Sequence, residues 1–391
     1  MQGVRHPRNI TGGTVRGQDL FGRDAFLVDL QRRVEVGSLL LLAPRRWGKS
    51  SVLQTFADGD PGRRRYVDLY DANTPDEFVD KVARACEGLS DRIKDIVAWA
   101  GDQTLGRIKG FDMGGVGFQL GEVPSREPGW KARGHDLVDA LSQDYVLILD
   151  EFPVLAKRLL DVDEPTGSEF LMWLRTIRQQ RGAPRFIFAG STSLSEVCAR
   201  AGLSATVNDL EGIPLPAFDE NDAVRLLRAV FGAEGVPGED PLFAAMIDCV
   251  GPEVPYFLQL IAQSVIGEYW RTNTLPTAAR IANLYESEVL SARTRHNLDD
   301  YWQRIDHVYT VTEAEVIRVV LSALSKRRRA ALSYTTIRNR VVARGFDPMV
   351  LDRVVPLMEN DFYVRRTSGN RSLAMLNRCL ADWWRIYHGG D

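Results

Sequence analysis

A short polar loop near the N-terminus follows an apolar run and carries residue types that bind phosphate. The run is Leu39-Leu40-Leu41-Leu42, and the residues that follow it are Ala43-Pro44-Arg45-Arg46-Trp47-Gly48-Lys49-Ser50-Ser51. In such a strand–loop–helix unit, backbone N–H groups at the helix N-terminus face the anion. Gly48 allows the backbone to approach the phosphates, the Lys49 ammonium reaches the β- and γ-phosphates, and the Ser50 hydroxyl can bind Mg²⁺. The sequence therefore predicts that residues 43–51 bind a nucleotide.

The first position of this loop departs from the usual pattern. The pattern G-x-x-x-x-G-K-S/T begins with glycine, whereas this chain has Ala43. Ala43 lies on the strand side of the loop, where a small residue suffices if its φ is negative. The alternative is a chance Gly-Lys-Ser at the start of an ordinary helix, and the apolar run before the loop argues against it.

Two carboxylates end a second apolar run further along the chain. Tyr145-Val146-Leu147-Ile148-Leu149 precedes Asp150 and Glu151. A continuous apolar run is typical of a strand buried on both faces, and open α/β sheets bind ligands at the carboxyl ends of their strands. Asp150 is therefore a candidate Mg²⁺ ligand, directly or through water, and Glu151 is a candidate general base for an attacking water. Together with the loop, this pair predicts a nucleotide-hydrolase core.

A third polar group follows the apolar run 185–189, where the chain continues as Gly190-Ser191-Thr192-Ser193. A polar residue at the end of a strand beside the phosphates can orient the attacking water or sense the γ-phosphate. Ser191 is the first candidate for this role and Thr192 the second. A serine cap at the start of a helix before Leu194 is an equally good interpretation of the same residues.

The composition excludes several other classes of protein. The chain has 391 residues, of which 45% are hydrophobic and 26% charged, as in an ordinary globular protein of two to three domains. No apolar run reaches the length of a membrane span, and the N-terminus lacks an apolar signal region, so we expect a cytoplasmic protein without a membrane partner. Four scattered cysteines without a C-x-x-C pair argue against zinc and disulfides, which leaves nucleotide-bound Mg²⁺ as the expected metal.

We expect four segments to position these motifs. Residues 1–19 are rich in Gly and Arg without periodicity and predict a flexible arm. Residues 20–215 form the core, with a β-hairpin insertion around 105–121. The character then changes to helices over 216–303, which predict a lid, and 304–391 form a last domain.

The expected elements follow from apolar spacing, caps and turns. In the core we expect helices from Asp24, from Thr74, over 134–143 and over 167–181. The strands expected in the core span 64–70, 145–150 and 185–189. In the lid we expect helices over 220–231, 241–249, 255–269 and 278–290. Pro255 begins one lid helix, with Gly251 before it, and could close over the nucleotide. A simple proline-initiated helix is the alternative.

The last domain has its own pattern. Helices are expected from Thr312 to Leu324, over 333–343 and over 347–358, followed by strands over 362–367 and 371–376. Three helices followed by a two-stranded hairpin predict a winged helix. Residues 306–391 carry a net charge of +5, against −8 for the rest of the chain. A basic module on an acidic body favours a nucleic-acid partner.

Two basic groups are the candidate contacts to double-stranded DNA. They are Lys326-Arg327-Arg328-Arg329 between the first two helices, and Arg365, Arg366 and Arg371 around the wing. Such residues would neutralise phosphates with little sequence preference. The third helix offers Asp352, Arg353, Glu359 and Asn360 among mostly apolar residues, which is a poor set for reading bases. A protein-docking module with solvated arginines is the alternative.

The motifs in this order resemble the archaeal-type ATPase family. The motifs are Phe21-Gly22-Arg23-Asp24, the loop 43–50 with its distinctive Pro-Arg-Arg, Leu149-Asp150-Glu151, Phe188-Ala189-Gly190-Ser191 and the segment 254–260, and the likeness extends to Asp382-Trp383-Trp384-Arg385. That family belongs to the AAA+/STAND side of the P-loop NTPases and resembles the origin-recognition ATPases. The resemblance implies an α/β fold with a parallel P-loop NTPase sheet, a helical lid and a winged helix.

The resemblance also implies roles for individual residues. Gly22 and Arg23 would lie near the adenine of ATP, Lys49 and Ser50 on the phosphates, Asp150 on Mg²⁺ and Glu151 at the water. Two functions remain open: an ATPase that remodels DNA or a protein partner, or a slow switch that reports ATP or ADP through lid rotation or homo-oligomerisation. Glu151 favours some hydrolysis. An arginine from a neighbouring subunit would raise the rate, and Arg178, Arg181 and Arg200 are candidates, although a solvated helix face explains them equally well.

Overall fold

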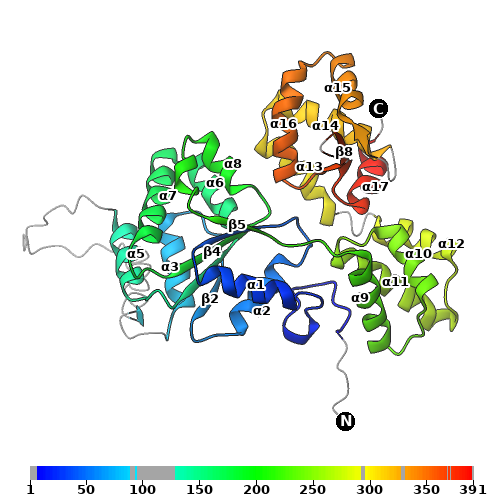
Figure 1. Cartoon of the computed structure of the whole chain (residues 1–391), viewed down its shortest axis with the longest axis horizontal. Coiled ribbons are helices and arrows are strands. Elements are labelled where there is room, and N and C mark those ends of the chain that lie inside the picture. The colour runs from blue at the N-terminus through cyan, green and yellow to red at the C-terminus, as the bar shows by residue number, and fades with distance from the viewer. Residues whose placement is uncertain are drawn as a thin grey trace, which may run out of the picture. The chain divides into compact units, whose positions relative to one another are not determined.

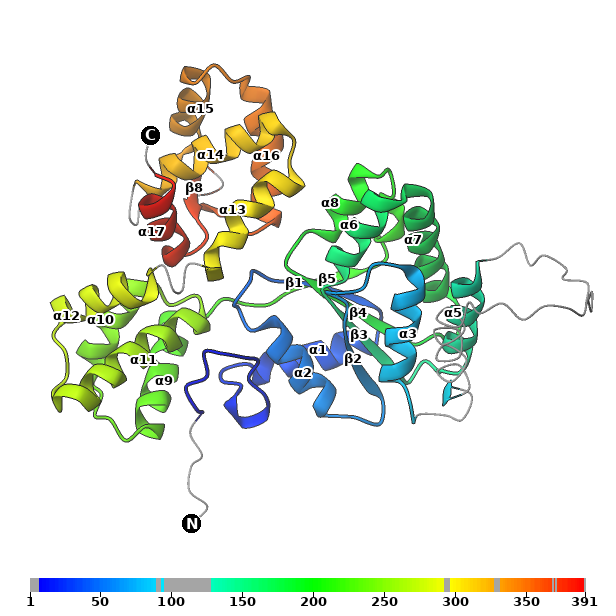
Figure 2. The same ribbon diagram turned by 180° about the vertical axis from the view of Figure 1, so that it is seen from behind.

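The computed structural model describes residues 7–88, 93–94, 128–291, 296–326, 331–367, 369 and 371–389. They divide into two compact units (Figures 1 and 2). The sheet unit comprises residues 26–42 and 53–214, and the helical unit comprises residues up to 25, 43–52 and 215 to the C-terminus. The hairpin expected around 105–121 lies outside the described residues.

The sheet unit is built on five parallel strands. They are β1 (Leu39–Leu42), β2 (Arg64–Asp68), β3 (Val146–Asp150), β4 (Arg185–Gly190) and β5 (Glu211–Pro214). Their order is β2-β3-β4-β1-β5, and every neighbouring pair is parallel. β3 is buried along its whole length, as its uninterrupted apolar run predicts. Because all five strands are parallel, their carboxyl ends lie at one edge, where the predicted catalytic motifs follow.

Helices of the sheet unit pack around this sheet. They are α1 (Asp24–Val34), α2 (Lys49–Asp58), α3 (Pro75–Ala85), α5 (Gly129–Asp139), α6 (Phe152–Val162), α7 (Glu164–Gln179) and α8 (Leu194–Arg200), and the first residues of α1 and α2 belong to the helical unit. The cap of α3 is confirmed, because the Thr74 hydroxyl accepts the Glu77 N–H at 3.1 Å. One core of aromatic and aliphatic side chains joins α3, α5, α6 and α7 to β3 and β4. Phe152 at the start of α6 lies 4.7 Å from the Phe188 ring on β4, centroid to centroid.

Three helix predictions in this unit need correction. The helix expected over 134–143 spans Gly129–Asp139 and follows directly after Pro128. The helix expected over 167–181 begins at Glu164, because Asp163 caps it by accepting the Thr166 N–H. Helix α6 was not predicted. Its Pro153 lies in the first turn, where the missing N–H is tolerated, so this proline begins a helix instead of preventing one.

Gly134 on α5 packs directly on the indole of Trp173 on α7. A Cβ added at Gly134 would lie 2.5 Å from Trp173 Cζ2, closer than carbon atoms approach. The indole is held in place, since it lies edge-on to Trp130 and its Nε1 donates to His135 Nε2 at 3.2 Å. We therefore expect Gly134→Ala to lower the free energy of unfolding by about 1–3 kcal/mol despite the better helix propensity of alanine.

Chemical denaturation of the two variants Gly134→Ala and Gly129→Ala checks this expectation. A Cβ at Gly129 on the same helix meets nothing within 4 Å, so that variant is the matched control and should not be destabilised. Equal stability of both variants would show that the α5–α7 contact does not require glycine.

The helical unit contains two groups of helices. The first is α9 (Glu220–Ala233), α10 (Asp240–Val250), α11 (Pro255–Thr272) and α12 (Ala278–Leu284), which continues as a π-helical turn, Tyr285–Val289. The four predicted lid helices are confirmed as elements, and the π turn falls within the last of them. Among the described residues, no helix is both long enough and apolar enough to cross a membrane.

The second group contains the three predicted helices and the hairpin. In order it comprises α13 (His296–Val308), α14 (Val311–Ser325), β6 (Leu332–Ser333), α15 (Tyr334–Ala343), α16 (Pro348–Asn360), β7 (Val364–Thr367), β8 (Ser372–Met375) and α17 (Arg378–Tyr387). The strands form an antiparallel sheet in the order β6-β8-β7. Helix α14 begins earlier than expected because Thr310, not Thr312, forms the capping box with Glu313. Helix α13 and the two-residue strand β6 were not predicted.

The N-terminal segment makes defined contacts over its described part, although its sequence suggests a loose arm. Arg8 pairs with Asp19 at 2.9 Å, and Asn9 Nδ2 donates to the Gln259 carbonyl on α11 at 3.2 Å. The Val15 N–H donates to the Ser51 hydroxyl at 3.0 Å. Gln259 and Ser51 come from other parts of the chain, so composition alone could not predict these contacts.

Candidate functional site

The predicted phosphate loop follows β1 directly and leads into α2. Lys49 is the first residue of α2 and is only 5% exposed. Gly48 has φ 87°, in the left-handed region that favours glycine. Among described residues other than glycine, positive φ occurs at Arg46, Glu151, Asn273 and Phe362, so Ala43 has the negative φ that its position requires. The local geometry therefore suits close approach of an anion to the helix N-terminus.

Arg46 occupies a left-handed backbone position, φ 68°, although it has a side chain. Such a conformation costs an ordinary residue about 1–2 kcal/mol. Its guanidinium lies over the ring of Tyr256, 4.7 Å from the centroid, and this contact offsets part of the cost. Tyr256 follows Pro255, the first residue of α11. The structure thus shows Pro255 as a helix-initiating proline whose neighbour contacts the loop.

Gly22 and Arg23 pack against a residue that the sequence analysis missed, Phe218. Gly22 has φ 66°, and a Cβ there would lie 3.2 Å from the Phe218 ring. The Arg23 guanidinium lies 4.6 Å from the centroid of the same ring, donates to the Pro216 carbonyl at 2.7 Å and donates to the Trp47 carbonyl at 3.2 Å. Burial lowers the pKa of Arg23 to about 10, and the charge of Asp222 opposes this shift. Arg23 stays charged at neutral pH and ties the loop to residues 216–218.

Asp150, in the sheet unit, ends β3 and is 1% exposed. Its Oδ2 accepts the hydroxyl of Tyr66 on the neighbouring strand β2 at 2.8 Å, and its Oδ1 accepts the Glu151 N–H at 3.0 Å. Burial and the charge of Asp150 both raise the pKa of Tyr66, so the phenol stays a neutral donor. Tyr66 therefore orients the carboxylate, a role that its position inside a predicted strand did not reveal. A buried, oriented carboxylate suits a hard cation such as Mg²⁺.

Glu151 lies in the sharp turn between β3 and α6. Its φ and ψ are 55° and 27°, a left-handed conformation that is uncommon for a residue with a side chain. Backbone strain of this kind concentrates at functional sites, where the surrounding structure holds it in place. Glu151 is thus held directly after β3, at the carboxyl edge of the sheet.

Three hydroxyl residues follow β4, and the structure distinguishes the helix cap among them from the two other candidates. The Ser193 hydroxyl accepts the Glu196 N–H at 3.3 Å and caps α8, so the helix-cap interpretation is correct for Ser193. Ser191 is 2% exposed and follows β4 directly, and Thr192 is also buried. β4 lies between β3 and β1, so its carboxyl end is flanked by the ends of the two strands that carry the other motifs. Ser191 keeps its place as the first candidate.

Two of the three candidate arginine fingers have partners within their own chain. Arg178 pairs with Asp209 at 2.9 Å with a side chain only 4% exposed, which makes it a structural residue. Arg200 pairs with Glu196 one helical turn away at 2.8 Å. Arg181 is exposed. The buried contacts of Arg178 argue against its reaching a nucleotide bound to a neighbouring subunit.

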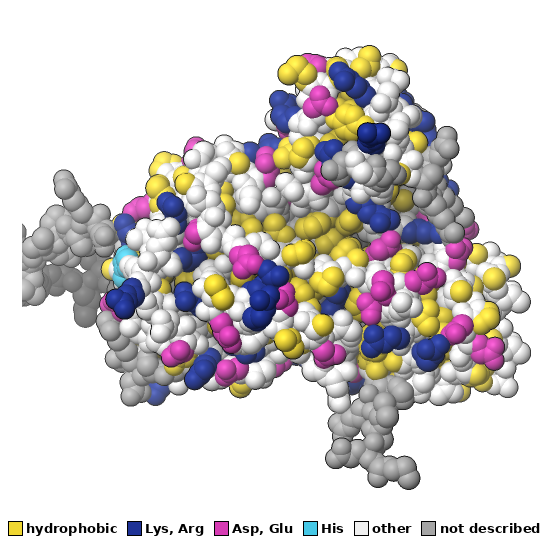
Figure 3. All heavy atoms as spheres, viewed as in Figure 1, with side chains coloured by type: hydrophobic (Ala, Val, Ile, Leu, Met, Phe, Trp, Pro, Cys, Tyr) yellow, Lys and Arg dark blue, Asp and Glu magenta, His cyan; other side chains and the backbone are white. Residues whose placement is uncertain are grey.

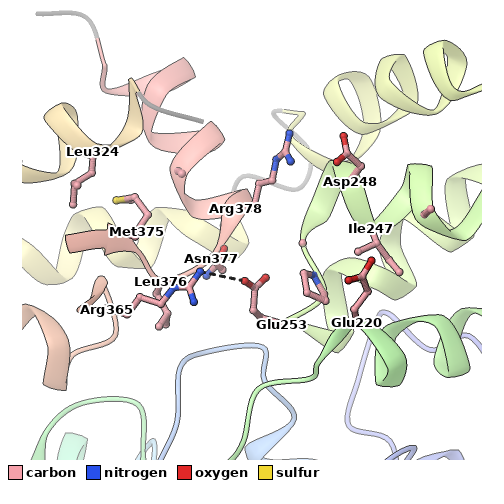
Figure 4. A pocket seen from close by; sticks show the side chains of 15 residues that line it. Glu220, Ile247, Asp248, Glu253, Leu324, Arg365, Met375, Leu376, Asn377 and Arg378 are labelled. Carbon is pink, nitrogen blue, oxygen red and sulfur yellow. Dashed lines mark ion pairs between the residues drawn. The ribbon is translucent and has the colours of Figure 1, made fainter. Parts of the chain in front are cut away.

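A cavity of about 450 Å³ lies within the helical unit, next to the segment that precedes Pro255 (Figure 4). Glu220, Asp248 and Glu253 line it from the first helical group, and Arg365 and Arg378 line it from the second. Arg365 Nη2 and Glu253 Oε1 are 3.8 Å apart, the ion pair dashed in Figure 4. The Glu253 carbonyl accepts the Phe218 N–H at 3.2 Å. The cavity therefore adjoins residues that support Phe218.

Within the described ranges, no group of three or more His, Cys, Asp or Glu side chains is arranged to hold a metal ion. All four cysteines are buried, and none is in a disulfide.

No family model matches this chain, and no curated protein matches it. Its structure is similar to that of a Walker-type ATPase of Pyrococcus abyssi, with 15% identity, 97% of this chain and 99% of that chain covered, and a TM-score of 0.67. It is also similar to the ORC2 protein of Aeropyrum pernix, solved as ADPNP–ADP complexes, with 11% identity, 95% and 93% coverage and a TM-score of 0.55. At these identities the similarity shows the fold alone. The predicted fold class is confirmed: this is the fold of the P-loop ATPases.

Proposed function

We propose that this protein binds Mg²⁺ and ATP and hydrolyses the nucleotide to ADP and phosphate. One observation carries the proposal. The loop 43–48 leads from β1 into the helix that Lys49 begins. The buried Asp150 ends β3 of the same parallel sheet, and the strained Glu151 comes directly after it. The fold similarity supports it, since one similar protein was solved with ADPNP and ADP. A chance helix start would not place a carboxylate pair at the same edge of the sheet.

Each predicted residue then has a chemical role. Lys49 supplies a positive charge to the β- and γ-phosphates, while backbone N–H groups of residues 43–51 bind them. Ser50 and Asp150 are the protein ligands for Mg²⁺, which neutralises charge on the phosphates when bound. Glu151 accepts a proton from the attacking water. Ser191 orients that water or contacts the γ-phosphate.

The adenine would lie beside Gly22 and Arg23. Two observations support this: Gly22 leaves no room for a side chain beside Phe218, and Arg23 bonds to the loop through the Trp47 carbonyl. Phe218 is itself buried, with the Arg23 guanidinium over its ring, so it fixes the position of Gly22 and Arg23 beside the loop. Residues 216–303 would then act as a lid, with Pro255 beginning the helix that contacts the loop through Tyr256.

ATP turnover with and without double-stranded DNA tests the proposal. Size exclusion with ADP and with a non-hydrolysable ATP analogue then shows whether nucleotide state changes the oligomer. Hydrolysis that DNA does not affect, combined with a nucleotide-dependent change of assembly, would favour the slow switch over the remodelling ATPase.

We further propose that the domain from α13 to α17 is a winged helix that binds double-stranded DNA. Its element order, three helices with a small antiparallel sheet, supports this. Several Lys and Arg side chains lie on this domain in Figure 3. Helix α15 adds exposed Arg338, Arg340 and Arg344, which the sequence analysis did not single out. Of the predicted contacts, Arg327, Arg328 and Arg329 lie outside the described residues.

The wing arginines are partly engaged within the chain. Arg366 pairs with Glu359 on α16 at 2.8 Å, and Arg365 faces Glu253 at 3.8 Å. Arg371 is exposed. These ion pairs are partly exposed, so DNA phosphates could compete for the arginines at little cost. A domain that docks a protein partner is the alternative, and the paired wing arginines are the observation that favours it.

We expect DNA affinity to fall steeply with salt and to depend on residues 326–329 and on α15. Replacing Arg338 and Arg340 together with alanine should lower affinity several-fold and reduce the slope of log K against log salt by about two. Fluorescence anisotropy with a short duplex at low and moderate salt measures both quantities. Arg280→Ala, which removes a surface partner of Glu268 in the first helical group, is the matched control. If wild-type protein does not bind DNA even at low salt, the result favours a domain that docks a protein partner.

A further inference from the structure

Arg45 of the phosphate loop is bound to α13, at the beginning of the second helical group. Its Nε lies 2.8 Å from Asp300 Oδ2, and the two side chains are 38% and 29% exposed. The backbone N–H of Arg45 donates to the hydroxyl of Tyr301, the next residue of α13. The loop therefore contacts α13 through both its backbone and a charged side chain.

Helix α13 continues this contact into a buried polar network. The Tyr301 carbonyl accepts the Tyr363 hydroxyl at 2.8 Å. One turn further along, the buried Arg304 donates to the Asp361 carbonyl at 2.7 Å and to the Tyr363 hydroxyl at 3.3 Å. The Tyr309 hydroxyl donates to the buried carboxylate of Asp361. One helix thus joins the loop to residues 361–363.

Residues 361–363 form the start of the β7–β8 hairpin. Phe362 has φ 65°, a strained left-handed conformation for a bulky residue, and β7 begins at Val364. Both neighbours of Phe362 are held by α13, through Asp361 and Tyr363. A shift of α13 would therefore release the strained turn from which the hairpin extends.

We propose that Arg45 is a positioning residue that reports the γ-phosphate to the hairpin. The inference rests on the proposed nucleotide site, because Arg45 lies within the loop that would bind the phosphates. With ADP, the guanidinium stays on Asp300 and α13 is held. With ATP, the negative charge of the γ-phosphate competes with Asp300 for the Arg45 guanidinium. The Arg45–Asp300 ion pair then weakens, and so do the contacts of α13 with residues 361–363.

The half-exposed ion pair limits the size of this coupling. Pairs of this exposure change equilibria by roughly two- to fivefold. Coupling is reciprocal, so a ligand that binds the hairpin would change the preference for ATP over ADP by the same factor.

The test compares dissociation constants for ADP and for a non-hydrolysable ATP analogue. In Asp300→Asn, the guanidinium of Arg45 can contact the γ-phosphate without breaking an ion pair with residue 300. Affinity for the analogue should therefore rise about two- to fivefold, while affinity for ADP changes less. In an Arg45→Ala background, the same Asp300→Asn change should leave the ratio of the two constants unmoved. Asp306→Asn, which removes a different surface pair of α13 with Arg318, is the matched control.

Hydrogen exchange of the segment 361–367 provides the second readout. In wild-type protein, exchange should be faster with the analogue than with ADP, and in Asp300→Asn it should be equally fast with both. An unchanged ratio of dissociation constants in Asp300→Asn overturns the inference while the proposed function stands. If wild-type protein binds neither nucleotide, that result contradicts the proposed function itself, independently of the variants.

Discussion

Lys49→Ala is expected to remove the stabilisation of this protein by Mg·ATP. The Lys49 ammonium is buried at the start of α2, where it faces no competition from bulk water. Loss of such a charge from a phosphate site costs about 3 kcal/mol, or roughly 100-fold in affinity. At a nucleotide concentration of 100 times the wild-type dissociation constant, stabilisation should fall from about 2.7 to about 0.4 kcal/mol. Thermal unfolding with and without Mg·ATP measures this difference.

Lys157→Ala is the control for this prediction. Lys157 forms a partly exposed pair with Asp161 on α6, so its loss should leave ligand stabilisation intact. Full stabilisation of Lys49→Ala by Mg·ATP would place the nucleotide elsewhere. A folded Lys49→Ala protein without stabilisation, beside a normal Lys157→Ala, would support the loop as the binding site.

Glu151→Gln is expected to abolish hydrolysis while keeping nucleotide affinity. Glutamine has the size of glutamate but cannot accept the proton of the attacking water. The left-handed backbone at this position is no harder for glutamine to adopt, because neither residue is branched at Cβ. We expect kcat to fall by about 10²- to 10⁴-fold with a dissociation constant for ATP close to that of wild type.

Single-turnover hydrolysis and equilibrium binding separate these two effects. Glu164→Gln, at the start of the exposed first turn of α7, is the control and should hydrolyse ATP at the wild-type rate. Wild-type turnover by Glu151→Gln would assign the proton transfer to another group. Loss of both binding and hydrolysis would instead indicate that Glu151 supports the turn after β3.

Local signals in the sequence were sufficient for the elements that carry the site. The strand that ends at Asp150 was predicted because a strand buried on both faces must be apolar at every position. The start of α3 was predicted because the Thr74 hydroxyl can cap the helix, and it accepts a backbone N–H three residues away. The phosphate loop was predicted because its chemistry requires glycine, lysine and serine in consecutive positions.

Helices α6 and α13 show where local signals were insufficient. The sequence analysis assigned no helix around Pro153, whereas in the structure Pro153 lies in the first turn of α6 and Phe152 packs on Phe188. Helix α13 has a mixed composition, and contacts of its Tyr301 and Arg304 with residues 361–363 stabilise it. Tertiary contacts therefore decided elements whose local preference was weak.

By itself, the sequence determined strands β1 to β4, the Thr74 cap of α3 and the chemistry of the loop, since these depend on residues within a few positions of one another. It did not reveal β5, β6 or the Thr310 cap of α14. Only the tertiary structure showed that Tyr66 orients Asp150, that Phe218 packs on Gly22 and Arg23, and that Arg45 pairs with Asp300. Each of these contacts joins residues far apart in the chain through single side chains. Such a contact leaves no periodic pattern in the sequence, because its geometry depends on how strands and helices pack.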